Sequence, residues 1–429
     1  MIKVIWLGTF SNEQVRQRIK SQVSIWEPIV RKLTGRQAYK ASDFAQWNTN
    51  AINSFNEGSY DVDLTVICVH TNVRGGIQRF DIDKVHYVLI DSRTSNLWDN
   101  FKRRILHIKY RYGINRKRIL DEIARIKPDI VHIMGAENPQ YSLSALDIPN
   151  NIPVLVQLQT LLNNPELKKY RDYKELEGFE REVLLRSDYI GTRVSAISQV
   201  IREYIKPNPT ILNIGLCVGE KLNLQERDTK YDFVYFSANL YKAADLAVEA
   251  FILAHKENPN ITLDIIGAYS ESLFDQLTKL IKKGGVEKAV FFEGRLATHD
   301  DVIRQIRKSR FALIPLKADF LSGTCREAMA NGLPLLTTRT QGDNGTILLN
   351  KDRETALISE IGNHQALATN MLRLINEPGL ADRLREAGAR YITENYSNQA
   401  VIDKWFRLYP ELIDNFHHNT KISDVFLNN

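Results

Sequence analysis

A short polar stretch in the second half of the chain has the residue types needed to bind a phosphorylated ligand. Ser322, Gly323 and Thr324 follow an apolar run and precede a helical pattern, so we expect them to open a helix. The first amides of a helix favour an anion, and glycine permits its close approach. Glu327 lies one turn further and Asp319 on the preceding loop, so both carboxylates can face that ligand. The alternative is structural, with Ser322 or Thr324 capping the helix and Glu327 solvated.

These residues need a scaffold, and the hydrophobic pattern predicts one. Short apolar runs rich in β-branched residues alternate with amphipathic stretches, which is typical of parallel sheets covered on both faces. We expect strands at residues 3–7, 63–70, 85–90, 129–134 and 153–158, with a helix at 116–126. The pattern restarts with strands at 232–236, 262–266, 290–292, 311–314 and 334–337, and helices at 243–255, 271–283, 300–308 and 324–331. The sequence therefore predicts an α/β fold with two doubly wound, Rossmann-like parallel-sheet domains.

The domain boundaries follow from the point where the pattern restarts. We expect a first domain over residues 1–218, a second over 219–395, and a C-terminal helix with a tail over 396–429. That helix carries Trp405 and either returns to the first domain or ends the second. Open α/β sheets bind ligands beyond the carboxyl ends of their strands, so two such domains facing a cleft should place functional residues just after strands.

Composition excludes several other classes of protein. With 429 residues, 43% of them hydrophobic and 25% charged, the chain is an ordinary globular one. No apolar run approaches the ~18 residues of a membrane span, and the first residues do not resemble a signal peptide, so we expect a cytoplasmic protein. Cys68, Cys217 and Cys325 are too far apart for a zinc site and are expected to be buried thiols. The net charge of +6 favours an anionic partner.

The acid at 319, followed after seven residues by Glu-Ala-Met-Ala-x-Gly-x-Pro and then a strand, resembles the donor-site motif of GT-B glycosyltransferases, specifically family 4. The resemblance is strongest over residues 230–400 and most specific at 326–338, while 128–137 resembles the segment that enters the family's active-site cleft. It implies a retaining transferase that moves a sugar from a nucleotide-diphosphate-sugar to a saccharide or lipid-linked acceptor, in cell-envelope or capsular polysaccharide synthesis. It implies no cofactor, because the nucleotide-sugar is a co-substrate.

The resemblance also assigns roles on the donor side. Glu327 matches the family's acid that binds the ribose hydroxyls, and Asp319 matches the acid that contacts the donor sugar, although the family has Glu there. Lys242 matches the lysine of a Lys-Gly-x-Asp segment that contacts the diphosphate. The arginine that usually precedes it is absent, and Ser237 and Asn239 stand nearby. The amides of the Ser-Gly-Thr segment would then stabilise more of the charge that grows on the leaving diphosphate.

Candidates on the acceptor side follow strands of the first domain. The family often has His-x-His here, but this chain has His132 and Met134, and we interpret His132 as a core residue. Glu137 lies just beyond the strand, where it could meet an acceptor hydroxyl, so it joins Asp319 and Lys242 as a catalytic candidate. The other acceptor-side candidates are Gly8, Thr9, Phe10, Asn138, Gln157 and Gln159.

Two other patterns carry weaker hypotheses. Asp61–Asp63 and Asp81–Asp83 have the Asp-x-Asp spacing of a metal site, but both precede strands, so we interpret them as turn acids and expect no metal. Residues 98–112 form a basic amphipathic stretch with aromatic residues, which predicts either an ordinary surface helix or a contact with an anionic membrane. The chain has no recognised nucleic-acid-binding module, so we expect no nucleic acid.

Two alternative functions stay open at this point. A non-catalytic GT-B subunit that partners an active transferase is favoured by Asp319 and by the missing arginine, whereas Glu327 and Lys242 argue against it. Another nucleotide-sugar enzyme on the same fold, such as an epimerase or a phosphorylase, would use the same cleft. The donor sugar, the base and the acceptor cannot be predicted from fold and motif alone.

Overall fold

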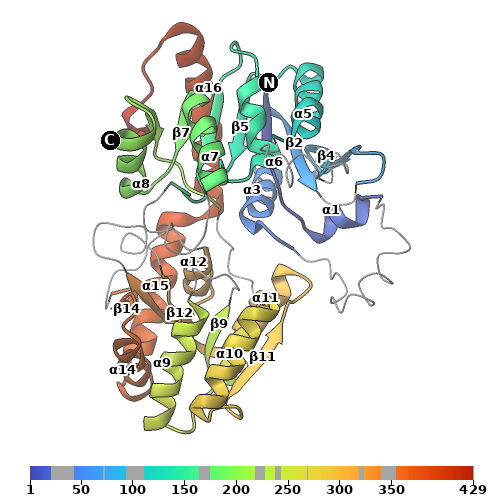
Figure 1. The fold of residues 1–429 in the computed structure, drawn as a ribbon. Helices are drawn as coiled ribbons and strands as arrows, with labels where there is room; N and C mark the ends of the chain where they lie inside the picture. Colours follow the sequence, from blue (N-terminus) through green and yellow to red (C-terminus); the bar gives the residue numbers. More distant parts are fainter. Residues whose placement is uncertain are drawn as a thin grey trace. The chain divides into compact units, whose positions relative to one another are not determined.

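A computed structural model describes residues 1–20, 43–70, 73–92, 111–163, 174–217, 228–236, 243–267, 269–317, 323–339 and 354–428. The chain divides into two compact units, shown as ribbons in Figure 1. The first unit comprises Met1–Cys217 together with Gln399–Asn429, and the second comprises Val218–Asn398. Each unit is built around one sheet, and together they confirm the predicted α/β class with two parallel-sheet domains.

The sheet of the first unit is parallel except for one edge strand. Its strands are β1 (Ile2–Gly8), β2 (Val62–His70), β3 (Ile77–Ile82), β4 (Val85–Asp91), β5 (Ile130–Met134), β6 (Val154–Gln157), β7 (Tyr189–Gly191) and β8 (Thr210–Leu212). They lie in the order β3-β4-β2-β1-β5-β6-β7-β8, and β3 pairs with β4 in the antiparallel direction. The chain order reverses between β1 and β5, and a doubly wound sheet binds its ligands at the carboxyl ends of the strands at such a point.

Helices cover both faces of this first sheet (Figure 1). They are α1 (Glu13–Arg18), α3 (Gln46–Glu57), α5 (Gly113–Ile126), α6 (Pro139–Ser142), α7 (Lys174–Arg186), α8 (Ser195–Val200) and α16 (Asn398–His418). Successive residues of β1 alternate between the two cores: Trp6 packs with α3 and α16, whereas Ile5 packs with α5 and α7. This is the period of two that a strand buried on both faces requires.

The C-terminal helix α16 packs on the first unit. The ring of Trp405 lies edge-on to the ring of Trp6, with centroids 5.4 Å apart. The indole N–H of Trp6 donates to the hydroxyl of Tyr409 at 2.8 Å. Beyond the helix, Leu427 forms a β-bridge with Leu212 at the edge strand β8. The last described residues of the chain therefore complete the sheet that its first residues begin.

The second unit has a fully parallel sheet. Its strands are β9 (Tyr231–Phe236), β10 (Leu263–Ile266), β11 (Val290–Gly294), β12 (Ser309–Ile314), β13 (Leu335–Arg339) and β14 (Ala356–Glu360), in the order β11-β10-β9-β12-β13-β14. Its helices are α9 (Ala244–Glu257), α10 (Glu271–Gly284), α11 (His299–Ile306), α12 (Gly323–Ala330), α14 (His364–Asn376) and α15 (Leu380–Tyr396). Helices α9, α10 and α14 share one core, and α11, α12 and α15 share the other. Here the chain order reverses between β9 and β12.

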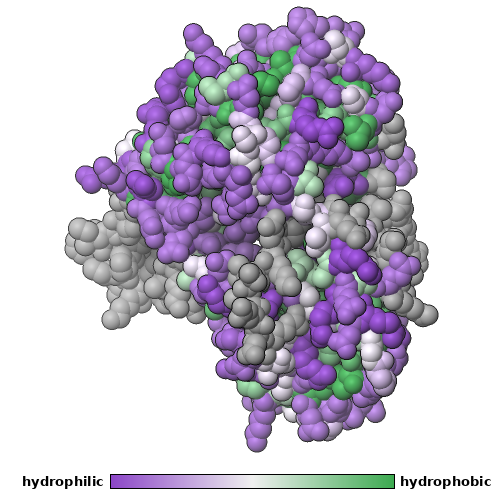
Figure 2. All heavy atoms as spheres, turned by 180° about the vertical axis from the view of Figure 1, so that it is seen from behind, coloured by the Kyte–Doolittle hydropathy of each residue, from purple (hydrophilic) through white to green (hydrophobic). Residues whose placement is uncertain are grey.

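The surface and the cysteines agree with the composition. On the face shown in Figure 2, hydrophilic residues cover most of the described surface, and hydrophobic residues lie between them in small groups. Cys68, Cys217 and Cys325 are buried free thiols, as predicted, and burial raises the pKa of Cys68 to about 12. Across the described helices, no segment is long and apolar enough to span a bilayer.

Candidate functional site

The start of the loop after β12 is fixed by hydrogen bonds to β13. The hydroxyl of Thr337 donates to the carbonyl of Ile314 at 2.8 Å. The hydroxyl of Thr338 accepts from the amide of Leu316 and donates to its carbonyl, both at 2.7 Å. Both threonines are buried, so these bonds are protected from water. The residues that directly follow β12, up to Leu316, are thus fixed against β13 at the point where the chain order reverses.

Helix α12 begins at Gly323 and carries the remaining donor-side candidates. Among the described residues outside its own helical turn, none has an atom within 4 Å of the position that a Cβ on Gly323 would occupy. Thr324 is buried in the first turn of α12, and Glu327 lies three residues further along the same helix. The carboxylate of Glu327 lies 3.4 Å from Nε2 of His299, and its side chain is 14% exposed. Gly323, Thr324 and Glu327 therefore share one helical turn at the carboxyl edge of the second sheet.

Several of the predicted site residues lie outside the described parts of the chain. These are Asp319, Lys242, Asn239, Ser322 and Ser237, together with residues 98–110 of the basic stretch. Their predicted roles stay predictions.

In the second sheet, where the chain order reverses between β9 and β12, an ion pair connects the segments that follow these two strands. No sequence motif indicated this pair. Lys317 follows β12, and its ammonium group pairs with the carboxylate of Asp245 in the first turn of α9. Asp245 is the last residue of the segment that resembles Lys-Gly-x-Asp. The side chains of Lys317 and Asp245 are 24% and 22% exposed, so water screens the pair only in part. The pair fixes the loop after β12 against the helix that follows β9.

In the first unit, Glu137 lies just after β5, at the corresponding reversal point. Burial raises the pKa of its carboxyl group to about 8, and the charge of Glu180 adds to the effect. The side chain folds over Gly135, because a Cβ built on that glycine would lie 2.6 Å from both carboxylate oxygens. Gly135 has a φ of +100°, which glycine adopts without strain. The glycine therefore makes the space in which this carboxyl group is held.

The other acceptor-side candidates divide into edge residues and core residues. Gly8 ends β1, and the hydroxyl of Thr9 donates to the carbonyl of Val69 at 2.8 Å. Asn138 caps α6 by accepting from the amide of Gln140 at 3.1 Å. Gln159, which is partly exposed, donates to the carbonyl of Met134 at 2.7 Å.

Two of the candidates are instead buried inside the unit. Phe10 is 1% exposed and packs against the ring of Tyr87. Gln157 is fully buried, and its amide donates to the carbonyl of Gly215 at 2.6 Å. Neither side chain reaches the surface at this sheet edge, because each is enclosed by the strands and turns around it.

His132 lies in the core, as predicted. It is fully buried, and burial lowers its pKa to about 3, so the ring is neutral. Its Nδ1 lies 2.7 Å from the hydroxyl of Tyr409, which already accepts from Trp6. The Tyr409 proton is therefore free to bond to Nδ1, and His132 serves to hold α16 on the sheet.

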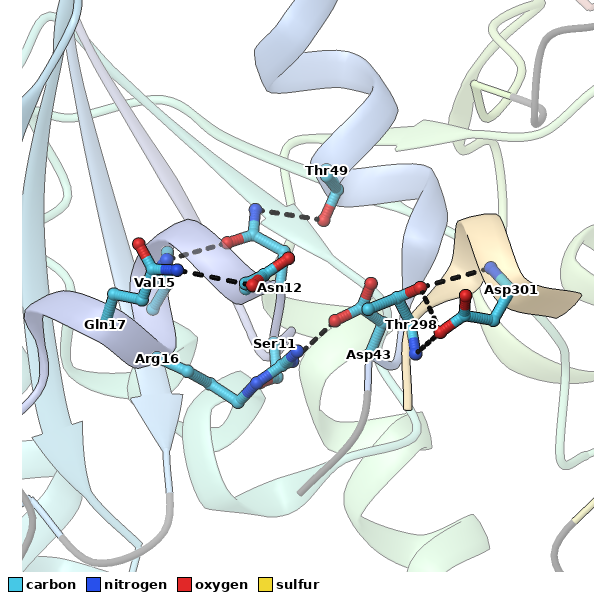
Figure 3. Close-up of polar contacts among 10 residues, drawn as sticks. Ser11, Asn12, Val15, Arg16, Gln17, Asp43, Thr49, Thr298 and Asp301 are labelled. Atoms are coloured by element: carbon cyan, nitrogen blue, oxygen red, sulfur yellow. Dashed lines mark hydrogen bonds and ion pairs between the residues drawn. The ribbon is translucent and has the colours of Figure 1, made fainter. Parts of the chain in front are cut away.

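A polar network that no sequence motif revealed follows β1 in the first unit (Figure 3). The guanidinium group of Arg16 pairs with Asp43 at 2.5 Å and donates to the hydroxyl of Ser11 at 3.2 Å. Asn12 caps α1 and donates to the hydroxyl of Thr49 on α3 at 3.4 Å. These contacts join segments that are far apart in the sequence, and they give the turn after β1 a fixed shape.

The Asp-x-Asp pairs lie away from the carboxyl edge of the first sheet. Asp61 and Asp63 are at the amino end of β2, while Asp81 is in β3 and Asp83 in the turn before β4. Asp81 contacts Nδ1 of His86 at 2.7 Å. Among the described residues, no three His, Cys, Asp or Glu side chains are grouped so that they could hold a metal ion.

Comparison with known proteins finds a family match for most of the second unit and solved structures that are similar over nearly the whole chain. Residues 220–391 match the family Glycosyl transferases group 1. The lipopolysaccharide core biosynthesis glycosyltransferase LpsD of Rhizobium meliloti is 21% identical over 81% of this chain and 98% of its own length. LpsE of the same organism is 23% identical over 54% of this chain. The chain spans only 58% of LpsE, and 43% of the related GtfA subunit of Streptococcus gordonii.

Solved structures show the same fold at low sequence identity. Sucrose-phosphate synthase from Thermosynechococcus elongatus superposes with a TM-score of 0.66 and 14% identity, over 96% of this chain and 99% of that one. TarM of Staphylococcus aureus, solved with UDP and saccharides, gives 0.64 and 13% over 95% and 100% of the two chains. The match in the second unit covers α12 and Glu327, and the superpositions extend over both sheets. Residues 220–391 therefore match the family Glycosyl transferases group 1, and the chain as a whole has the GT-B fold.

Proposed function

We propose that this protein transfers a sugar, with retention of configuration, from a nucleoside-diphosphate-sugar to a saccharide or lipid-linked acceptor of the cell envelope or capsule. The relatives LpsE and LpsD, which are named for lipopolysaccharide core biosynthesis, support the class of acceptor. TarM and Anabaena HepE, both solved with UDP, support the class of donor.

The observation that carries the proposal is the turn of α12 that holds Gly323, Thr324 and Glu327. It lies after β12, beside the point where the chain order of the second sheet reverses, and inside the segment that matches the family. In the proposed complex, the first amides of α12, at Gly323 and Thr324, bind the diphosphate, and Glu327 accepts hydrogen bonds from the ribose hydroxyls. Departure of the nucleoside diphosphate increases the negative charge on its β-phosphate, and preorganised amides stabilise that charge as it develops.

The remaining predicted residues complete the donor side of the proposal. Lys242 adds a positive charge at the diphosphate, and Asp319 contacts the donor sugar. Lys317 lies near the same loop, but its charge is shared with Asp245, so we assign the diphosphate to Lys242 and the helix amides.

Glu137 is the proposed acceptor-side group. A carboxyl group with a pKa of about 8 exchanges its proton near neutral pH, which suits a group that must take or return the proton of an acceptor hydroxyl. If the acceptor is lipid-linked, the basic residues 98–112 would hold the protein on an anionic membrane surface.

A thermal-shift screen tests the proposal on the purified full chain. UDP, GDP, ADP, CMP and dTDP are compared for the wild type, for Glu327→Ala, and for the control Glu249→Ala. Glu249 lies on α9 in the same unit, and 44% of its side chain is exposed. A nucleotide at 100 times its Kd adds about 2.7 kcal/mol of stability, which is visible as a raised melting temperature.

The expected result is a shift with one nucleoside diphosphate that is lost in Glu327→Ala and kept in Glu249→Ala. A folded wild-type protein that responds to none of the nucleotides would overturn the donor-site assignment and favour a non-catalytic subunit. A shift that survives in Glu327→Ala would show that the nucleotide binds elsewhere.

A further inference from the structure

The side chain of His299 faces Glu327, and it belongs to no recognised sequence motif. It is the first residue of α11, directly after Thr298. Thr298 and Asp301 form a capping box, which Figure 3 shows: the amide of Asp301 donates to the Thr298 hydroxyl at 3.1 Å, and the amide of Thr298 donates to the Asp301 carboxylate at 3.3 Å. Such reciprocal bonds fix the backbone at a helix start. The position of His299 is therefore set by the fold and not by its own contacts alone.

The imidazole ring reaches from α11 to α12. Its Nε2 lies 3.4 Å from Oε1 of Glu327, and the two side chains are 17% and 14% exposed. This separation exceeds that of a strong hydrogen bond, so the two groups meet as a polar contact. Low exposure strengthens it relative to a surface pair. The contact acts on one oxygen of the carboxylate.

A carboxylate that recognises a ribose must present an oxygen to the two neighbouring hydroxyls in a fixed orientation. The last torsion of a glutamate side chain is broad and roughly two-fold, so a neighbouring group is needed to hold the carboxylate of Glu327 in one orientation. The imidazole ring held beside Oε1 restricts that rotation and leaves Oε2 to accept from the sugar. Preorganisation of this kind lowers the entropy lost when the ligand binds.

We propose that His299 is a positioning residue that orients Glu327 and so makes the nucleotide site selective for ribonucleoside over 2′-deoxyribonucleoside diphosphates. This inference rests on the proposed function of the donor site and deepens it. It gives α11 a part in nucleotide recognition, although the residues of the recognised motif all lie on α12 and in the loop before it.

The chain offers a closely matched control. His364 is the first residue of α14 in the same unit, and its Nδ1 lies 3.8 Å from Oε2 of Glu249 on α9. This pair is also a histidine at a helix start that faces a glutamate on a neighbouring helix. Its side chains are about half exposed, and it lies outside the turn of Glu327. If loss of any histidine–glutamate contact weakens nucleotide binding, substitution of His299 and of His364 should have the same effect. If His299 acts on ribose recognition, only its substitution should change the preference for the ribose form.

Isothermal titration of the full chain measures the dissociation constants of UDP and 2′-deoxy-UDP, or of the corresponding pair for the base that the thermal-shift screen identifies. The variants are His299→Phe, which keeps the ring volume, His299→Gln, which keeps an N–H donor, and the control His364→Phe. We expect the wild type and His364→Phe to prefer the ribose form by roughly tenfold, since a hydrogen bond to a charged group has about that effect. In His299→Phe the preference should fall to about one, mainly through weaker binding of the ribose form. His299→Gln should recover part of it.

The outcomes separate this inference from the function on which it rests. If the wild type binds no nucleoside diphosphate, the donor-site proposal fails and this inference fails with it. If the wild type prefers the ribose form and His299→Phe keeps that preference, only the role of His299 is refuted. Equal weakening of both nucleotides in His299→Phe would also refute it, because that result indicates a general loss of structure at the site.

Discussion

Asp264 lies in the middle of β10 and is fully buried. Its carboxylate accepts one hydrogen bond, from the side-chain amide of Gln305 at 2.9 Å. Burial raises its pKa from 3.8 to about 7, and the charge of Glu293 adds to the effect. Asp264→Asn keeps the shape of the protonated carboxyl group and removes its ionisation. We expect this substitution to stabilise the second unit above neutral pH.

The sign and size follow from the two states of the carboxyl group. Below about pH 4 it is protonated in both the folded and the unfolded chain, so the raised pKa has no effect on stability. Between that pH and about 7 the unfolded chain loses the proton while the folded chain keeps it, so stability falls as the pH rises. At 1.36 kcal/mol per pKa unit, the penalty is about 2 kcal/mol at pH 5 and about 4 kcal/mol at pH 8. Asp264→Asn should remove most of this dependence.

Urea unfolding at pH 5 and pH 8 measures the change in stability caused by Asp264→Asn. Because the tryptophans lie in only one of the two units, two spectroscopic signals can show which unit has changed. The tryptophans are residues 6, 26, 47, 98 and 405, all within the first unit. Tryptophan fluorescence therefore follows the first unit alone, whereas far-ultraviolet circular dichroism follows both. The gain from Asp264→Asn should appear in circular dichroism and leave the fluorescence transition unchanged.

The control lies on the neighbouring strand β9. Asp232 accepts from the amide of Thr262 at 3.0 Å and pairs with Arg310 at 2.9 Å, so Asp232→Asn should destabilise the same unit at pH 8. Parallel stability profiles for the wild type and Asp264→Asn between pH 5 and 8 would refute the reasoning, because Asp264 would then ionise as it does in the unfolded chain.

Two further predictions concern the acceptor side. Gly135→Ala should destabilise the first unit by about 1–3 kcal/mol, because alanine is strained at a φ of +100° and its Cβ displaces the carboxylate of Glu137. Urea unfolding followed by tryptophan fluorescence measures it, and an unchanged midpoint would contradict this account of the glycine. Replacing Lys102, Arg103 and Arg104 by Gln should weaken binding to anionic vesicles at low salt, and co-sedimentation checks this. Wild-type protein that sediments equally with neutral and anionic vesicles, or with neither, would exclude the membrane contact.

The long apolar runs made most of the sheet predictable. Strands β1, β2, β4, β5 and β6, and later β9 to β13, lie where continuous apolar segments predicted them, because a strand buried on both faces must be apolar throughout. The edge strand β3 was missed, since its sequence IQRFDI alternates between partly buried and exposed residues. The strands β7 and β8 were missed because each has only three residues, too few to form a pattern.

The candidate site was predictable only where it is local in sequence. Gly323, Thr324 and Glu327 share one helical turn, so a motif can represent them. His299 reaches Glu327 from another helix, and Lys317 pairs with Asp245 across the sheet. Contacts of this kind arise when strands assemble in a particular order, and no spacing rule along a single chain specifies them. The same limit applied to Phe10, which follows a strand as a functional residue would and nevertheless turns into the core.

The division of the first unit between the two ends of the chain has a consequence for its biosynthesis. Trp6 emerges early from the ribosome, but its partner Trp405 is added only after the whole second unit has been translated. At the usual rate of translation the second unit alone, residues 218–398, takes roughly 10 to 40 s. During that time the face of the nascent sheet that α16 will cover stays open to solvent, whereas the second unit is continuous in sequence and can finish folding first. The uncovered aromatic face is thus a natural site for a chaperone to bind while the chain is being made.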